Sequence, residues 1–262
     1  MSVVALIPVM RQDGRVRTWI VAVVAAVLLS AVIGASYWSP VAVVAVACAG
    51  ALMVGLGWPQ LLGIPARKTL STVISLAGVG AVLLASVAPT GMALAWTVVV
   101  VALGVMAVFM VQLVRGTGQP HRLESTFGAS TGLVLAVLGA GWVAADRLSD
   151  NEADTGMMLV TGISMLMTIA VCVLPWPDRL VAPLGVLLAV LTGMLGAAVT
   201  SDVPLLPAAV VGAVVGIVVV CFRRLVLAEG GPEQLPAALA VGSAPVMASG
   251  GLVYFLEKML LV

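Results

Sequence analysis

The sequence predicts an all-α integral membrane protein with about nine transmembrane helices, and three observations lead to this fold class. Nine long apolar stretches contain no Asp, Glu, Lys, Arg or His, and the charged residues lie in the gaps between them. The chain of 262 residues is 62% apolar and only 9% charged. Its mean hydropathy is +1.24. Such a composition leaves too little polar surface to cover a water-soluble domain of this size.

Each apolar stretch is long enough to cross a bilayer, because a hydrocarbon core about 30 Å thick needs roughly 20 residues of α-helix. The predicted spans cover residues 18–36, 40–58, 69–88, 92–114, 127–145, 156–174, 182–200, 205–222 and 237–256. Residues 1–10 are apolar but too short to cross, and three arginines then lead into a full-length span with no small-residue cleavage signature. We therefore expect residues 1–17 to form a cytoplasmic or interfacial N-terminal lead-in and not a cleaved signal peptide.

Basic residues determine the expected orientation. Most of them precede the first span or occupy every second gap after it: Arg11, Arg15, Arg17, Arg67, Lys68, Arg115, Arg122, Arg179, Arg223 and Arg224. On the other side of the predicted topology, the only basic residues are Arg147, in a gap, and Lys258, after the last span. Because cytoplasmic loops carry the excess of Lys and Arg, the amino terminus is expected inside and the carboxyl terminus outside. The Arg, Ala, Val and Gly usage indicates a bacterial plasma membrane.

Aromatic residues support the span boundaries. All six tryptophans lie within a few residues of a predicted span end: Trp19, Trp38, Trp58, Trp96, Trp142 and Trp176. Amphipathic rings prefer the headgroup level of a bilayer, so these positions are typical of interfacial belts.

An internal repeat is predicted from a shift of the chain by about 112 residues. The shift places loop-edge Pro, Arg and Gly residues on one another: Pro65 and Arg67 on Pro177 and Arg179, Gly118 and Pro120 on Gly230 and Pro232. It also lays four consecutive spans over the following four, in the same direction through the membrane. The predicted organisation is one helix at 18–36, repeat one at 40–150 and repeat two at 152–262.

Repeats of this kind are common in transporters, whose substrate sites lie at the repeat interface and are often formed by interrupted helices. Equivalent parts of the fifth and ninth spans contain helix-weakening residues, and these are the candidates for a substrate pathway: Gly128, Ser130, Thr131, Gly132, Ser243 and Pro245. We expect the two helices to face each other across the repeat interface. The alternative is close helix packing, which is the commoner role of a GxxxG spacing such as Gly128 to Gly132.

Other polar groups give weaker signals. The acidic gap 146–154 has enough oxygens for a divalent cation but lacks an EF-hand pattern, so a solvated loop is expected. His121 could handle a proton or bind a headgroup, although a solvated loop histidine is the simpler interpretation. The cysteines Cys48, Cys172 and Cys221 are dispersed over three spans and give no disulfide or metal-ligand pattern. No metal or cofactor is therefore expected.

Features that the sequence lacks exclude several classes of function. The sequence contains no HExxH, GxSxG or Walker motif, so neither catalytic residues nor an enzymatic activity are expected. A net charge of +1 without a clustered basic face argues against nucleic acid. No predicted span contains Asp, Glu, Lys, Arg or His, which argues against proton-coupled transport. The favoured function is a permease-like transporter or lipid flippase for a neutral or amphipathic substrate.

The alternative is a non-catalytic subunit or scaffold of an envelope protein complex, motivated by the short loops and the small-residue helix faces. The expected partners are the lipid bilayer and, on the alternative, other membrane proteins or further copies of the chain.

Overall fold

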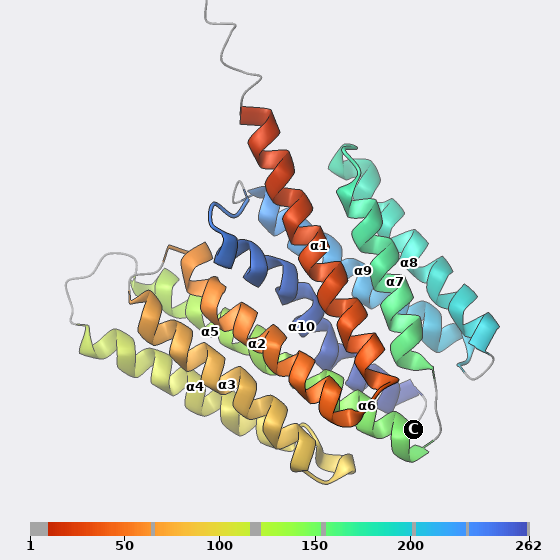
Figure 1. The fold of residues 1–262 in the computed structure, drawn as a ribbon, viewed down its shortest axis with the longest axis horizontal. Coiled ribbons are helices and arrows are strands. Elements are labelled where there is room, and N and C mark those ends of the chain that lie inside the picture. The colour runs from red at the N-terminus through yellow and green to blue at the C-terminus, as the bar shows by residue number, and fades with distance from the viewer. Residues whose placement is uncertain are drawn as a thin grey trace, which may run out of the picture.

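The computed structural model describes residues 10–63, 66–115, 122–152, 156–200, 203–228 and 231–260 (Figure 1). These residues contain helices and no strand, which confirms the all-α fold class. The elements in chain order are α1 (Met10–Ser36), α2 (Pro40–Leu61), α3 (Arg67–Val87), the 3-10 turn η1 (Thr90–Met92), α4 (Ala95–Val114), α5 (Arg122–Leu138), α6 (Ala140–Glu152), α7 (Met157–Val173), α8 (Asp178–Thr200), α9 (Leu205–Ala228) and α10 (Leu235–Leu260).

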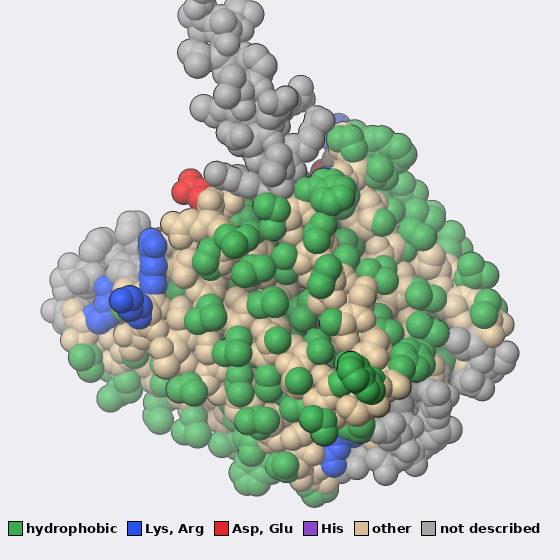
Figure 2. Space-filling view, in the orientation of Figure 1, with side chains coloured by type: hydrophobic (Ala, Val, Ile, Leu, Met, Phe, Trp, Pro, Cys, Tyr) green, Lys and Arg blue, Asp and Glu red, His purple; other side chains and the backbone are tan. Residues whose placement is uncertain are grey.

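The described helices match the predicted spans. Eight segments are long and apolar enough to cross a membrane, with α5 and α6 counted together, and α7 adds a shorter apolar helix of 17 residues. At about 1.5 Å per residue, 17 residues extend roughly 25 Å, which is near the lower limit for a transmembrane helix. Large apolar side chains cover the outer surface, where lipid tails solvate them (Figure 2). The protein is therefore a multi-pass membrane protein.

The helix interruptions differ from those expected. The fifth span is broken at Gly139, between α5 and α6, and not at Gly128 to Gly132. A Cβ at Gly139 would overlap the methyl group of Met247, so a side chain from α10 occupies the space at the break. The predicted break at Pro245 is absent, because α10 continues through this proline. A proline removes one backbone hydrogen bond from a helix, and a transmembrane helix tolerates this loss where neighbouring helices surround it.

The helices form two groups joined by α1 and α10. Helices α2 to α6 pack against one another on one side, and α7, α8 and α9 pack together on the other (Figure 1). Helix α10 packs most extensively on α2, α1 and α6, and less on α9 and α5, while α1 connects α10 with α7 and α2. In the part of the chain that the structure describes, the two groups make little direct contact. The internal repeat stays a prediction.

Helix α10 lies at the centre of the bundle and α4 at its edge. In the membrane-spanning part of α10, 78% of the residues are buried, against 17% of the residues in that of α4. Glycines bring α10 against its neighbours, since a Cβ at Gly57 would strike the carbonyl of Pro236 and one at Gly141 would strike the backbone of Gly250. Backbone-to-backbone packing of this kind is typical of membrane helices, where dispersion replaces the hydrophobic effect.

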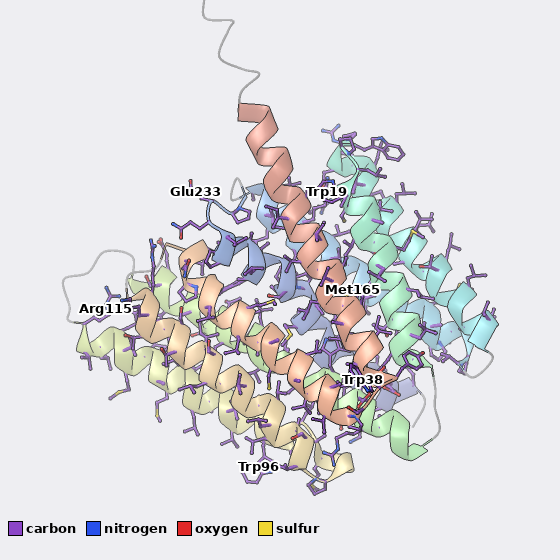
Figure 3. The ribbon with its side chains drawn as sticks, viewed as in Figure 1. Trp19, Trp38, Trp96, Arg115, Met165 and Glu233 are labelled. Atoms are coloured by element: carbon purple, nitrogen blue, oxygen red, sulfur yellow. The ribbon has the colours of Figure 1, made fainter. Side chains whose placement is uncertain are left out.

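The tryptophans divide into two classes. Those at positions 19, 38, 96 and 176 are 49–86% exposed, as expected of interfacial belts, and Trp38 and Trp96 lie near helix ends (Figure 3). Trp58 and Trp142 are only 3% and 0% exposed, so their rings pack inside the protein and do not form part of an exposed aromatic belt. Both are core residues, because glycines on facing helices leave room for their rings.

Candidate substrate-binding site

The candidate residues on α5 form a packing contact with α2. The indole N–H of Trp58 donates to the carbonyl oxygen of Gly128 at 2.9 Å. A Cβ at Gly132 would overlap the same indole ring. Gly132 therefore allows a large ring to approach the helix backbone and reach the carbonyl of Gly128, which is the packing interpretation of this GxxxG spacing.

The hydroxyls on α5 and α10 lie in different environments. Thr131 is exposed and its hydroxyl donates back to the carbonyl of Phe127 at 2.9 Å, whereas Ser130 is half-buried. Ser243 on α10 is fully buried, and its hydroxyl donates to the carbonyl of Leu239 at 2.8 Å. Although α5 and α10 are in contact, as expected, the structure does not place Thr131 and Ser243 in one enclosed cavity.

A narrow apolar cavity lies beside Pro245, where α10 meets α1, α7 and α9. Its volume is about 60 Å³. The lining is almost entirely hydrocarbon, with Ala22, Ile169 and Val219 among the contributing side chains. Of the sequence-predicted candidates, Pro245 lines this cavity, and one charged residue, Arg223, lies at its edge.

Arg223 connects the cavity to a charged cluster at the helix ends. Its Nε donates to the carbonyl of Cys172 at 3.2 Å, near the end of α7, and its Nη1 forms a short ion pair with Asp178 at the start of α8. Arg224 Nε donates to the other carboxylate oxygen of Asp178 at 2.8 Å. The last carbonyls of a helix lack internal partners and attract cations, whereas an acidic residue is favoured in the first turn. The local sequence thus explains why these charges meet.

This cluster belongs to the basic end of the bundle, where α1, α3, α5, α8 and α10 begin and α2, α4, α7 and α9 end. Basic side chains also gather at the same end on the α3 and α4 side, where Figure 3 labels Arg115 (Figure 2). His121 and the side chain of Arg122 lie outside the described residues.

The opposite end contains buried charges that the sequence interpretation missed. Asp146 and Glu257 are only 5% and 1% exposed, on α6 and α10 respectively. Arg147 donates to the carbonyls of Ala85 and Ala88 at 2.6 and 2.7 Å. The expected solvated loop at 146–154 is thus wrong for its first part, because α6 continues to Glu152.

The α3 carbonyls explain the position of Arg147. Residue 89 is proline and has no N–H, so the carbonyl of Ala85 cannot form its usual helical hydrogen bond. A guanidinium from α6 takes that place. Lys258 makes a similar contact, since its ammonium donates to the carbonyl of Gly91 at 2.9 Å. A usable signal was the spacing of Asp146 four residues after Trp142, which places both on one helix face.

Comparisons with known protein families, with curated proteins and with solved structures find no match. The function is therefore argued from the helix arrangement and the cavity.

Proposed function

We propose that the protein is a non-enzymatic membrane transporter of the permease or flippase type, which moves an amphipathic substrate across the bilayer. The observation that carries this proposal is the position of the apolar cavity. It is bounded by α1 and α10, the two helices through which α2–α6 and α7–α9 are joined, together with α7 and α9. A cavity at such a boundary changes shape whenever the two groups move.

The helix arrangement supports movement of this kind. Alternating access in secondary transporters is largely rigid-body rocking of one helix group against another around a fixed site. Direct contact between α2–α6 and α7–α9 is small in the described residues, so little packing opposes a change in their relative position. Pro245 lies in α10 at the cavity, where a missing backbone hydrogen bond weakens the central helix.

The runner-up is a scaffold that binds another membrane protein. An apolar groove of about 540 Å³ runs along α7 and α8, lined by Leu159, Ile163 and Leu195 among others. A transmembrane helix of a partner would fit such a groove, but lipid tails fill it equally well. The groove therefore favours neither function, whereas the cavity favours transport.

The test is a lipid-flipping assay with purified protein in phosphatidylcholine vesicles that contain a fluorescent phospholipid. An impermeant reductant bleaches the outer leaflet, and flipping exposes the protected fraction. We expect bleaching beyond the outer-leaflet fraction only when the protein is present. Bleaching equal to that of protein-free vesicles, together with stoichiometric copurification of a membrane partner, would favour the scaffold.

A proline variant makes this assay specific to the cavity. Pro245→Ala restores a helical hydrogen bond, so we expect a more stable protein with slower flipping, because the weak point of α10 is removed. Pro183→Ala is the matched control, since Pro183 also lies inside a transmembrane helix but is exposed and does not line the cavity. Equal flipping rates for the two variants would contradict a role for α10 in transport.

A further inference from the structure

We propose that the cavity and the charged cluster at its edge form one binding site for an anionic phospholipid from the leaflet at the basic end. This inference rests on the transport function proposed above and names its substrate class. A segment of one acyl chain enters the cavity between α1, α7, α9 and α10, while the phosphate lies against Arg223 and Arg224. The occupant is a lipid of the bilayer and not a free phosphate.

The cavity selects a flexible chain. Its lining is hydrocarbon apart from the edge at Arg223, so a polar ligand would lose its hydration without compensation. Its volume of about 60 Å³ is well below the roughly 150 Å³ of a cavity that binds benzene. A ring is therefore too large, whereas a few methylene groups of a chain that enters from the surrounding lipid fit.

The charged cluster supplies a site for the phosphate. Arg223 and Arg224 share a single carboxylate, that of Asp178, so the ion pairs leave a surplus positive charge. In the part of the chain that the structure describes, Arg223 uses two N–H groups and Arg224 uses one in these contacts, and a guanidinium has five. Arg224 is 58% exposed at its side chain, which leaves it accessible to a headgroup, whereas Arg223 is 13% exposed and faces the cavity edge.

The depth of the cluster matches the headgroup level. It lies where α7 ends and α8 begins, and the connecting residue Trp176 is 49% exposed. Trp19 on α1, two residues before the cavity-lining Val21, is 60% exposed (Figure 3). Basic pockets between transmembrane helices at such a level bind anionic lipid headgroups. The cavity extends inward from this level, since its lining on α9 runs from Val219 past Arg223 to Leu227. An acyl chain can therefore enter the inner part of the cavity while the phosphate lies against the guanidinium of Arg223.

Photolabelling tests this site. The full-length protein is reconstituted in vesicles of phosphatidylcholine and phosphatidylglycerol, with a photoreactive group in the acyl chain of either lipid. We expect the phosphatidylglycerol probe to label α1, α7, α9 or α10 at the cavity. The phosphatidylcholine probe should label the same residues only weakly. Soluble glycerophosphate should not compete. Equal labelling by both lipids, competition by glycerophosphate, or labelled peptides from other helices would each overturn the proposal.

Two variants separate the two parts of the ligand. Arg224→Gln should reduce phosphatidylglycerol labelling about fivefold, since one basic residue near an anionic lipid contributes about a factor of that size. Ala22→Leu fills the cavity and should reduce labelling by both lipids. The matched controls are Arg67→Gln, on a helix that does not line the cavity, and Ala31→Leu, on the exposed face of α1. Reduction by the controls as well as by the variants would overturn the site.

The flipping assay then separates this inference from the function on which it rests. Labelling at the cavity without protein-dependent flipping would leave a lipid site and overturn the transport function. Flipping without labelling at the cavity would leave the function and overturn the site.

Discussion

Trp58 on α2 and Gly128 on α5 are joined by a hydrogen bond of 2.9 Å between the indole N–H and the backbone carbonyl. The contact buries the ring almost completely and gives the indole the polar partner that it needs in an apolar core. It also assigns a role to the glycines of α5, because a side chain at Gly132 would occupy the place of the ring.

Gly132→Leu should destabilise the protein, since the added side chain forces α5 away from Trp58. Overpacking of a core costs typically about 1–3 kcal/mol, and here the clash involves a rigid ring. Thr131→Leu is the matched control, because Thr131 is exposed on the same helix and its new side chain meets lipid. Thermal unfolding in detergent measures both. Equal melting temperatures for the two variants would contradict the packing role of Gly132.

Gly141→Ala should separate α6 from α10. A Cβ at Gly141 would strike the backbone of Gly250, which cannot move aside as a flexible side chain could. Gly80→Ala on α3 is the control, since nothing lies within 4 Å of its Cβ position. There the substitution should be neutral or stabilise by about 0.5–1 kcal/mol, because Gly lowers helix stability relative to Ala. A lower melting temperature for Gly80→Ala than for Gly141→Ala would contradict this packing.

Arg147→Met should lower stability by about 1.5–3 kcal/mol, the range for hydrogen bonds to a charged group. It removes both donors from the carbonyls of Ala85 and Ala88 at the end of α3. Arg147→Lys should restore only part of the loss, because both bonds come from Nη1 and the shorter lysine side chain does not bring its ammonium to the same position. Arg67→Met, at an exposed position, is the control. Full stability of Arg147→Met in a denaturation series would show that these bonds contribute nothing.

The spans could be predicted from the sequence because helix length and composition in a membrane are local properties. Hydropathy locates each segment to within a few residues, as the agreement of α2 and α3 with the predicted spans shows. The break at Gly139 was not visible in this way. It depends on Met247, a residue more than a hundred positions away that fills the space beside the glycine.

The site could be predicted only in part, because it is assembled from distant segments. Pro245 was identified from its effect on a helix, and it lines the cavity. Ala22 and Val219 carry no local signal, since alanine and valine fill every span of this chain. The sequence predicts a loop at Asp146, because the contact that explains the charge next to it is not local. The guanidinium of Arg147 donates to the carbonyl of Ala85, which Pro89 leaves without its usual backbone donor.

Cysteine labelling can decide the orientation, which stays a prediction. The basic end is expected in the cytoplasm because ten of the twelve Lys and Arg residues lie on that side of the predicted topology. Tyr37, in the turn between α1 and α2 at the opposite end, is 68% exposed, and Trp176, at the basic end, is 49% exposed. Each is replaced by cysteine in a background without Cys48, Cys172 and Cys221.

An impermeant maleimide should label Tyr37→Cys in intact cells, and Trp176→Cys only after the membrane is permeabilised. The reverse pattern would place the basic end outside and with it the proposed lipid site in the outer leaflet. Labelling of both variants in intact cells would be inconsistent with a helix path in which α1 and α7 end at opposite sides, and would remove the basis for placing the cavity in one leaflet.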